Sequence, residues 1–183
     1  MNLNIALLSF ILTFCISPSW AEVTPTLNSD AIKATFGSYG VTILNQTEST
    51  RVANLHSTHS GREICRTLAV TEFVLPMDPK LSLEHEKIRA GGSIGATLRD
   101  AGFSINKKLL IKTEIVAGPA FGQLSNQTVE PGTPLATRVY ALFAQSSERA
   151  IPYAIIAEAY HPAHQPPVHE EVSDAPALTA AAD

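Results

Sequence analysis

The feature that most constrains the fold of this chain is the order of its apolar segments. Six short segments are rich in β-branched and aromatic residues, and turn-forming residues separate them, as is typical of antiparallel strands. A segment with helical spacing lies between the third and the fourth. The predicted strands cover residues 39–43, 51–55, 64–75, 109–116, 137–145 and 151–161.

An amphipathic helix is predicted over residues 82–101. Ser82 can cap its first turn, and Gly102 suits the left-handed position that follows a helix. Gly91 and Gly92 each cost about 1 kcal/mol inside a helix, so we expect the helix to bend or restart there. Its apolar stripe consists of Leu83, Ile88, Ile94, Leu98 and Ala101.

These elements predict an α+β domain in two layers. Strands that short turns join pair antiparallel, and the helix must bury its stripe on a sheet face. We therefore expect an antiparallel sheet of about six strands with the helix packed on one face. The two outer hairpins match at an offset of 87 residues, from Arg51/Arg138 to Ile64/Ile151. This match is interpreted as the general likeness of hairpins and not as a repeat.

The first 21 residues predict a cleavable signal peptide. They contain no Asp, Glu, Lys or Arg, and the apolar run from Ile5 to Ile16 is too short to span a bilayer. Small residues at positions 19 and 21 predict cleavage after Ala21. We expect one domain over residues 22–162 and a disordered tail over residues 163–183, which is rich in Pro, Glu and Ala.

The composition narrows the compartment and the partners. Cys65 is the only cysteine beyond the predicted cleavage site, so no intramolecular disulfide can form, which favours a bacterial periplasm. A net charge of −4 gives no footprint for nucleic acid, and no second apolar stretch is long enough to span a membrane. The histidines lack the spacing of a metal site, and we expect no metal or cofactor.

Two charged residues interrupt apolar strands. Because side chains alternate along a strand, Arg66 is expected to share a face with Ile64, Leu68 and Val70. In the last strand, Glu158 is expected to share a face with Ala154, Ile156 and Tyr160. A buried ion without a partner costs several kcal/mol, so each of these charges requires a counter-ion, hydrogen bonds or a ligand.

Several interpretations of these charges remain open. Arg66 and Glu158 can form a buried salt bridge, or they can protect exposed edge strands from association. Alternatively they line a ligand pocket, in which Arg66 holds a carboxylate and Glu158 holds a hydroxyl group. The sequence Gly91-Gly92-Ser93-Ile94-Gly95 also spells the G-x-S-x-G pattern of hydrolases, but that elbow must follow a strand, and a helix is predicted here.

Three segments resemble the chorismate lyase family. Cys65-Arg66-Thr67 resembles its Ala-Arg-Ser/Thr strand, and the segment from Ser93 to Leu98 is similar to its Pro-Leu-Gly-x-x-Leu element. The closing hairpin, residues 142–162, is similar to the one that ends Glu-x-Phe-Leu-Pro in that family. The three segments occur in the family's order and cover most of residues 41–162.

The resemblance implies an antiparallel sheet that buries an aromatic product. It implies that Arg66 binds the carboxylate, that Glu158 binds the ring hydroxyl, and that Ile94 provides a backbone contact, without a cofactor. The implied activity is that of a carbon–oxygen lyase, with Arg66 and Glu158 as catalytic residues, releasing pyruvate and a hydroxybenzoate from chorismate or a relative. The family's Gly-Arg-Arg-Ser run is replaced by residues 143–146, Phe-Ala-Gln-Ser. This difference favours the alternative function, a periplasmic binding protein for a small aromatic carboxylate. The third possibility is an interaction module in which Arg66 and Glu158 only pair with each other.

Overall fold

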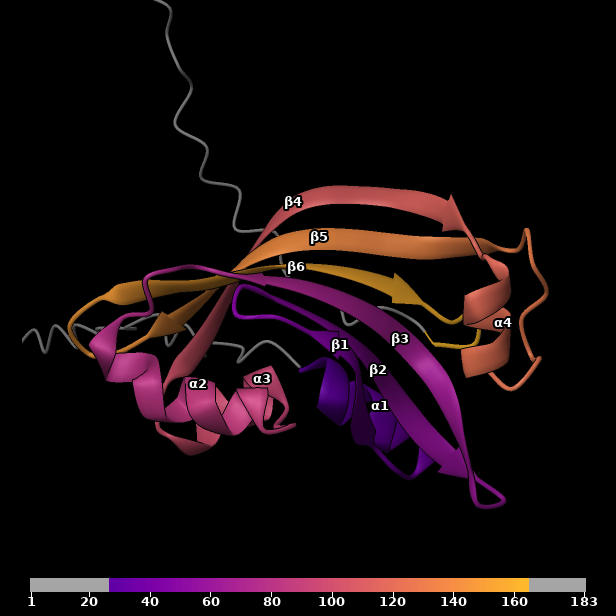
Figure 1. The fold of residues 1–183 in the computed structure, drawn as a ribbon, viewed down its shortest axis with the longest axis horizontal. Coiled ribbons are helices and arrows are strands. Elements are labelled where there is room, and N and C mark those ends of the chain that lie inside the picture. Colours follow the sequence, from indigo (N-terminus) through magenta and orange to yellow (C-terminus); the bar gives the residue numbers. More distant parts are fainter. Residues whose placement is uncertain (1–26, 165–183) are drawn as a thin grey trace, which may run out of the picture.

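The structure, a computed structural model, describes residues 27–164 (Figure 1). The predicted signal peptide and residues 165–183 of the predicted tail lie outside this range. His164, two residues beyond the expected end of the domain, is buried. In chain order the elements are α1 (Asn28–Phe36), β1 (Gly40–Gln46), β2 (Thr50–His59), β3 (Arg62–Phe73), the 3-10 helix η1 (Pro79–Leu81), α2 (Ser82–Arg89), α3 (Ile94–Asp100), β4 (Ser104–Val116), α4 (Pro119–Leu124), β5 (Pro134–Gln145) and β6 (Ala150–Tyr160).

The described chain forms one six-stranded antiparallel sheet with helices packed on it, which confirms the predicted α+β class. The strand order is β1-β2-β3-β6-β5-β4, and the sheet is open. Helices α1, α2 and α3 lie beneath one face (Figure 1). The short turn at Ser60 and Gly61 closes the β2–β3 hairpin with both residues at positive φ, which suits the right-handed twist of paired strands.

The sheet has an approximate internal two-fold symmetry. Ala69 pairs with Glu158, and Thr71 pairs with Ile156. The offset of 87 converts one pair into the other, because it relates Ala69 to Ile156 and Thr71 to Glu158. The register shift at Leu55/His56 of β2 recurs at the same offset, at Leu142/Phe143 of β5. The match between the hairpins, interpreted above as general likeness, therefore extends to the pairing register and to the irregularities of the two halves.

The helical region differs from the expected single helix in its details. It breaks at Gly91 and Gly92, as predicted, and Gly91 has a φ of +112° that only glycine adopts readily. Ser82 is not the cap, because η1 precedes it and the Asp78 side chain accepts the capping hydrogen bond from Lys80 N. Helix α4 lies between the predicted strands over residues 109–116 and 137–145, where no helix was expected.

The buried side chains form three clusters. The largest lies between α2, α3 and the strands β5 and β6, and its fully buried members include Ile88, Leu98 and Tyr153. A second cluster packs α1 on β2 and β3 through Ile32 and Ala69. The third packs α4 against Leu68 and Ala159. Their neighbours along the strands, Ala69 and Glu158, face α1, so α4 lies on the opposite face of the sheet.

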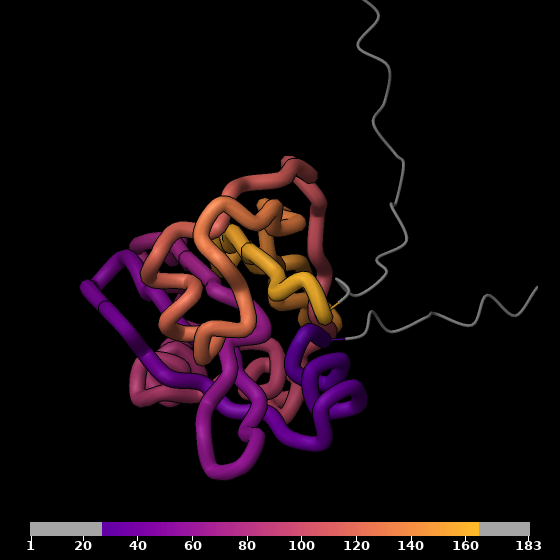
Figure 2. The backbone as a smooth tube through the Cα atoms, turned by 90° about the vertical axis from the view of Figure 1, so that its right-hand side faces the viewer, coloured from indigo at the N-terminus to yellow at the C-terminus, as the bar shows by residue number. Residues whose placement is uncertain are grey.

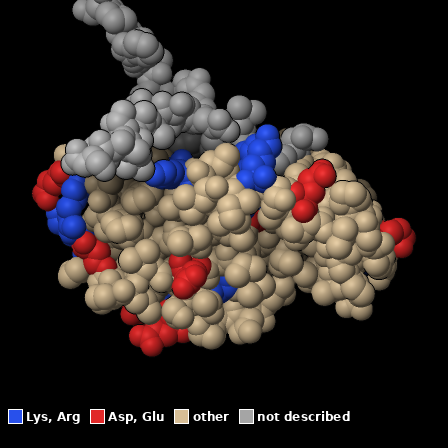
Figure 3. All heavy atoms as spheres, turned by 90° about the horizontal axis from the view of Figure 1, so that it is seen from above, with Lys and Arg blue, Asp and Glu red and all other residues tan. Residues whose placement is uncertain are grey.

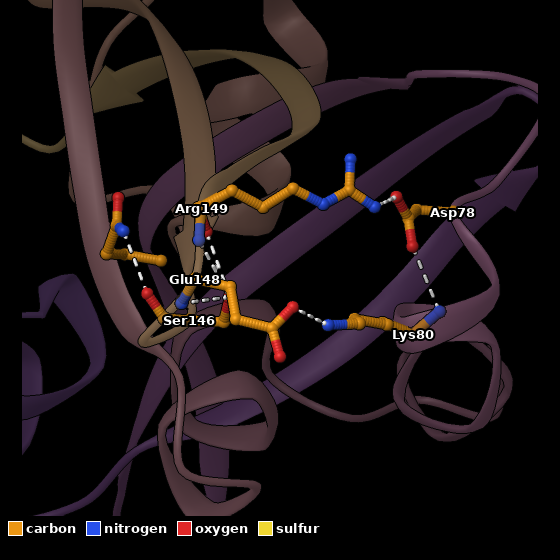
Figure 4. Close-up of polar contacts among 6 residues, drawn as sticks. Asp78, Lys80, Ser146, Glu148 and Arg149 are labelled. Atoms are coloured by element: carbon orange, nitrogen blue, oxygen red, sulfur yellow. Dashed lines mark hydrogen bonds and ion pairs between the residues drawn. The ribbon is translucent and has the colours of Figure 1, made fainter.

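Two ion pairs attach the β5–β6 turn to the segment before α2 (Figure 4). Arg149 Nη2 lies 2.5 Å from Asp78 Oδ2, and Lys80 Nζ lies 2.5 Å from Glu148 Oε2. Both pairs are solvent-exposed over much of their surface, so each contributes at most about 1 kcal/mol. They fix one end of the helical layer on the sheet.

The face opposite α1–α3 is less covered. Seen from that side, charged side chains are scattered and most of the described surface is uncharged (Figure 3). Val70, which pairs with Ala157 at the two-fold axis, and Ile155 are 47% and 43% exposed there. Within residues 27–164, no helix is long and apolar enough to cross a membrane.

Candidate functional site

A cavity of about 50 Å³ lies between the sheet and the helices α1 and α3. Aliphatic side chains such as Leu55, Leu142 and Ile156 form its walls. Polar and charged groups reach it from both layers, and they are the residues that give the cavity its chemistry. They are Asn28, Ser29, Tyr39, Arg51, Thr71, Ser93, Lys107, Tyr140 and Glu158.

The register of the sheet explains why these side chains converge. Arg51 pairs with Thr71, and Thr71 pairs with Ile156, so these residues form one row across three strands. Glu158 lies in the adjacent row of the same face, between Ala69 and Arg138. Side chains two residues apart on a strand point to the same side, so both rows face the helices.

Glu158 is the acidic group of the cavity. Its side chain is 4% exposed, its Oε1 accepts a hydrogen bond from Asn28 Nδ2 at 3.3 Å, and its Oε2 accepts one from Tyr160 Oη at 2.5 Å. Burial, together with the Glu158 charge, raises the pKa of Tyr140 and of Tyr160, so both phenols remain protonated. The predicted face of Glu158 is confirmed, since Ala154 and Ile156 lie in the core on the same side.

Arg51 is the buried cation of the cavity, and sequence reasoning missed it. It is 3% exposed, and its Nη1 donates to the carbonyl oxygens of Ile88 at 3.0 Å and Gly92 at 2.9 Å. Its Nε has no hydrogen-bond partner, and no carboxylate among the described residues lies within ion-pair distance of it. Burial lowers the pKa of the guanidinium, although burial alone does not bring an arginine near neutrality.

Lys107 brings a second cation to the same cavity from β4. Its Nζ lies 4.6 Å from the centroid of the Tyr140 ring, within the range of a cation–π contact. Burial lowers the pKa of Lys107, while the charge of Glu158 raises it and that of Arg138 lowers it. Lys107 and Arg51 thus bring positive charge to a site that also contains the Glu158 carboxylate.

Tyr39 and Ser93 line the cavity next to each other. The Tyr39 hydroxyl donates to Ser93 Oγ at 3.2 Å and so joins the segment before β1 to the start of α3. Ser93 follows the α2–α3 break and not a strand, so the G-x-S-x-G sequence does not form a nucleophile elbow. Ser29 Oγ, buried at the start of α1, also lines the cavity and has no hydrogen-bond partner within residues 27–164.

Arg66 does not share a face with Leu68 and Val70, which corrects the expectation from strict alternation. Leu55 pairs with Thr67 and His56 pairs with Cys65, so Arg66 is an extra residue on β3. Such a bulge places two successive side chains on the same side of the sheet. Arg66 therefore points toward α1 together with Thr67, while Leu68 packs in the α4 cluster on the other face.

Arg66 lies beside the cavity and not in its lining. Its Nε donates to Ser57 Oγ at 2.8 Å, and its guanidinium carbon lies 3.7 Å from the centroid of the Phe36 ring. No ion pair joins it to Glu158 within the described chain. Burial and the Arg66 charge lower the pKa of nearby His161 to about 4, which keeps that imidazole neutral.

Asn28 connects the surroundings of Arg66 with the cavity. Its amide donates to Thr67 Oγ1 at 3.1 Å as well as to Glu158, and its Oδ1 lies 2.7 Å from His164 Nε2. This contact joins the two ends of the described chain, and Figure 2 shows those ends side by side. Of the three residues predicted for the site, Glu158 and Ile94 line the cavity, and Arg66 does not.

Residues 27–164 contain no cluster of three or more potential metal ligands. His161 and His164 make hydrogen bonds to the side chains of Thr128 and Asn28. His56 lies 3.3 Å from Thr42 Oγ1. The groups that line the cavity offer hydrogen bonds and fixed charges.

The chain matches no protein-family profile and no curated protein sequence. Among solved structures, it is similar to the ligand-binding domain of a protein described as a GntR-family transcriptional regulator from Bordetella bronchiseptica. The identity is 16%, the TM-score is 0.47, and the match covers 72% of this chain and 90% of that one. It is also similar to the C-terminal domain of Yurk from Bacillus subtilis subsp. subtilis str. 168, with 17% identity, a TM-score of 0.37, and coverage of 75% and 82%.

Proposed function

We propose that this domain binds a small aromatic carboxylate in the cavity between the sheet and the helices α1 and α3. The observation that carries the proposal is the lining of the cavity, where the Glu158 carboxylate, the Arg51 guanidinium and the Lys107 ammonium meet among aliphatic walls. A hydroxybenzoate has matching groups, since its hydroxyl can donate to Glu158 and its carboxylate can accept from a cation.

The size of the cavity sets a condition on binding. Its volume of about 50 Å³ is smaller than the roughly 150 Å³ of an apolar cavity that holds benzene. An aromatic ring therefore enters only if part of the lining moves outward. If Tyr39 and Ser93 separate, their 3.2 Å hydrogen bond is lost at a cost of about 1 kcal/mol, and the packing of Tyr39 against the α1 cluster adds to that cost.

A second candidate function is the lyase reaction on chorismate or a relative. The basic run that the family carries after its long loop is replaced here, but Arg51 and Lys107 bring two cations to the cavity, as a substrate with two carboxylates requires. In this reaction the bond between the ring and the enolpyruvyl oxygen breaks, and the hydrogen that the ring loses ends on the enolpyruvyl carbon. Aromatisation drives the reaction, so the protein needs to supply only orientation and charge.

Calorimetric titration with 4-hydroxybenzoate tests the binding function, and incubation with chorismate tests the lyase. We expect saturable 1:1 binding of 4-hydroxybenzoate that Glu158→Gln weakens at least fivefold and that the distant control Arg149→Met leaves unchanged. Hydroxybenzoate released from chorismate by the wild type and not by Glu158→Gln supports the lyase. Binding without turnover supports the binding protein. If the protein neither binds 4-hydroxybenzoate nor converts chorismate, both proposals are refuted.

We also propose that the domain acts after export, in the periplasm of a bacterium. The proposal depends on residues 1–21, whose small residues at positions 19 and 21 favour cleavage after Ala21, and on Cys65 as the only cysteine beyond that point. Intact-mass measurement of protein from the periplasmic fraction should give a chain that begins at Glu22. A full-length chain recovered from the cytosolic fraction would contradict this proposal.

A further inference from the structure

We infer that Arg51 forms the subsite that holds the ligand's carboxylate, and that Arg66 does not hold it. The inference rests on the proposed function, because it names which end of the ligand each part of the cavity receives. It differs from the role that the family resemblance implies for Arg66. Arg51 lines the cavity and Arg66 does not.

The first argument concerns hydrogen-bond donors that have no acceptor. Buried polar groups in folded proteins nearly always have partners, and exceptions call for an explanation. Arg51 Nε and Ser29 Oγ are both buried, both belong to residues that line the cavity, and neither has a partner among residues 27–164. An arginine Nε can only donate, so the group that completes this site must be an acceptor.

The second argument concerns charge. A guanidinium that is 3% exposed loses nearly all of its hydration, and burying a charge is costly unless an opposite charge compensates it. The two carbonyl oxygens that Nη1 contacts are neutral acceptors, and no described carboxylate pairs with Arg51. A ligand carboxylate supplies both the missing charge and the missing acceptor for Arg51 Nε.

A purely structural role for Arg51 explains only part of these contacts. The bonds from Nη1 to Ile88 and Gly92 anchor the α2–α3 break on the sheet, and they account for one nitrogen of the guanidinium. They also fix the plane of the side chain, because arginine donors form a rigid fork. The anchoring therefore orients Nε, which makes Arg51 suited to a directional contact with a carboxylate.

The geometry divides the cavity into two ends. Glu158, with its contacts to Asn28 and Tyr160, repels a carboxylate and accepts a hydroxyl hydrogen. Arg51 lies in the row of the sheet next to that of Glu158. Hydrogen bonds to backbone carbonyl oxygens at the α2–α3 break hold its side chain. Tyr39 lies near both ends, since the charge of Arg51 lowers its pKa and that of Glu158 raises it, although burial is the larger effect.

The test compares 4-hydroxybenzoate with 4-hydroxybenzamide, in which a neutral amide of similar shape replaces the carboxylate, on four proteins. For the wild type we expect the carboxylate to bind at least tenfold more tightly than the amide. In Arg51→Met this preference should fall below threefold, while the affinity for the amide changes little. Arg66→Met and the surface control Arg149→Met should keep the preference. Loss of the preference in Arg66→Met and its retention in Arg51→Met would overturn the inference and leave the proposed function intact.

A measurement on the wild type decides the matter even if Arg51→Met does not fold. The protein labelled with ¹⁵N-arginine gives a separate signal for each Nε–H group, and Arg51→Lys identifies that of Arg51. Addition of 4-hydroxybenzoate should shift this signal downfield as Nε gains a charged acceptor, and the amide should shift it less. An unchanged Arg51 signal at saturating 4-hydroxybenzoate would refute the subsite, and failure of both ligands to bind would refute the proposed function itself.

Discussion

A double-mutant cycle on Arg66 and Glu158 separates a ligand site from a structural salt bridge. The perturbations are Arg66→Met, Glu158→Gln and their combination. Arg66→Met removes the 2.8 Å bond to Ser57 and the stacking over Phe36, and Glu158→Gln leaves Asn28 or Tyr160 without its acceptor. Each single change therefore costs about 1–3 kcal/mol of unfolding free energy, reduced by the relief of a buried charge.

The coupling between the two changes is the informative quantity. The two side chains share no hydrogen bond or ion pair in the described structure, and Thr67 and Asn28 stand between them. Sites without a shared contact add to within about 0.5 kcal/mol. We therefore expect a coupling energy below that value. A small part of it acts through His164, whose pKa burial lowers, while the charge of Glu158 raises it and that of Arg66 lowers it.

Urea denaturation followed by far-ultraviolet circular dichroism measures the four unfolding free energies. A direct buried ion pair would behave differently, because removal of one partner costs about 3–5 kcal/mol and removal of both recovers much of that loss. A coupling energy above about 1.5 kcal/mol would therefore refute our separation of the two charges. It would also restore the interaction module as the simplest explanation of both residues.

Three further predictions follow from other contacts. His161 has a pKa of about 4 in the folded state against about 6.5 in the unfolded state, so its neutral form favours folding above pH 6.5. About 2 kcal/mol of that stability should be lost as the pH falls from 6.5 to 4. Urea melts of the wild type and of His161→Gln at both pH values check this, and equal losses in the two proteins would contradict it. In Gly95→Ala the new Cβ would lie 2.9 Å from Leu27 Cδ2, and both residues line the cavity. Calorimetry should therefore show that the affinity for 4-hydroxybenzoate falls severalfold, while the free energy of unfolding falls by less than about 2 kcal/mol. An unchanged affinity would place the ligand elsewhere. Arg149→Met removes the exposed pair with Asp78 and should change the unfolding free energy by less than about 1 kcal/mol, and a larger loss would show that this pair is coupled to the core.

The architecture and the face on which Glu158 lies could be predicted from the sequence. Strand propensity, turn residues and helical spacing depend on near neighbours, and they sufficed for the six antiparallel strands and the break at Gly91 and Gly92. The face of Glu158 followed from alternation because β6 is regular through its pairs with Ala69 and Arg138. Ile94 was placed at the site by resemblance, and it lines the cavity.

The position of Arg66 could not be predicted, because a bulge inverts the alternation and no local pattern marks it. The shift depends on how Leu55 and His56 of the partner strand pair, which only the assembled sheet determines. Arg51 was missed because it follows a polar turn and looks like a surface charge at the start of a strand. The available signal was the hairpin match, which aligns Arg51 with Arg138 and Thr71 with Glu158.

The central claim is that the cavity between the sheet and the helices α1 and α3 is where a ligand binds. The most direct test maps backbone amide shifts of the ¹⁵N-labelled protein during titration with 4-hydroxybenzoate. We predict that the largest shifts occur at Asn28, Ile94, Gly95 and Glu158, and that the amides of α4 stay unchanged. Shifts that centre on α4 or on the uncovered face around Val70, or no shifts at millimolar ligand, would contradict the claim.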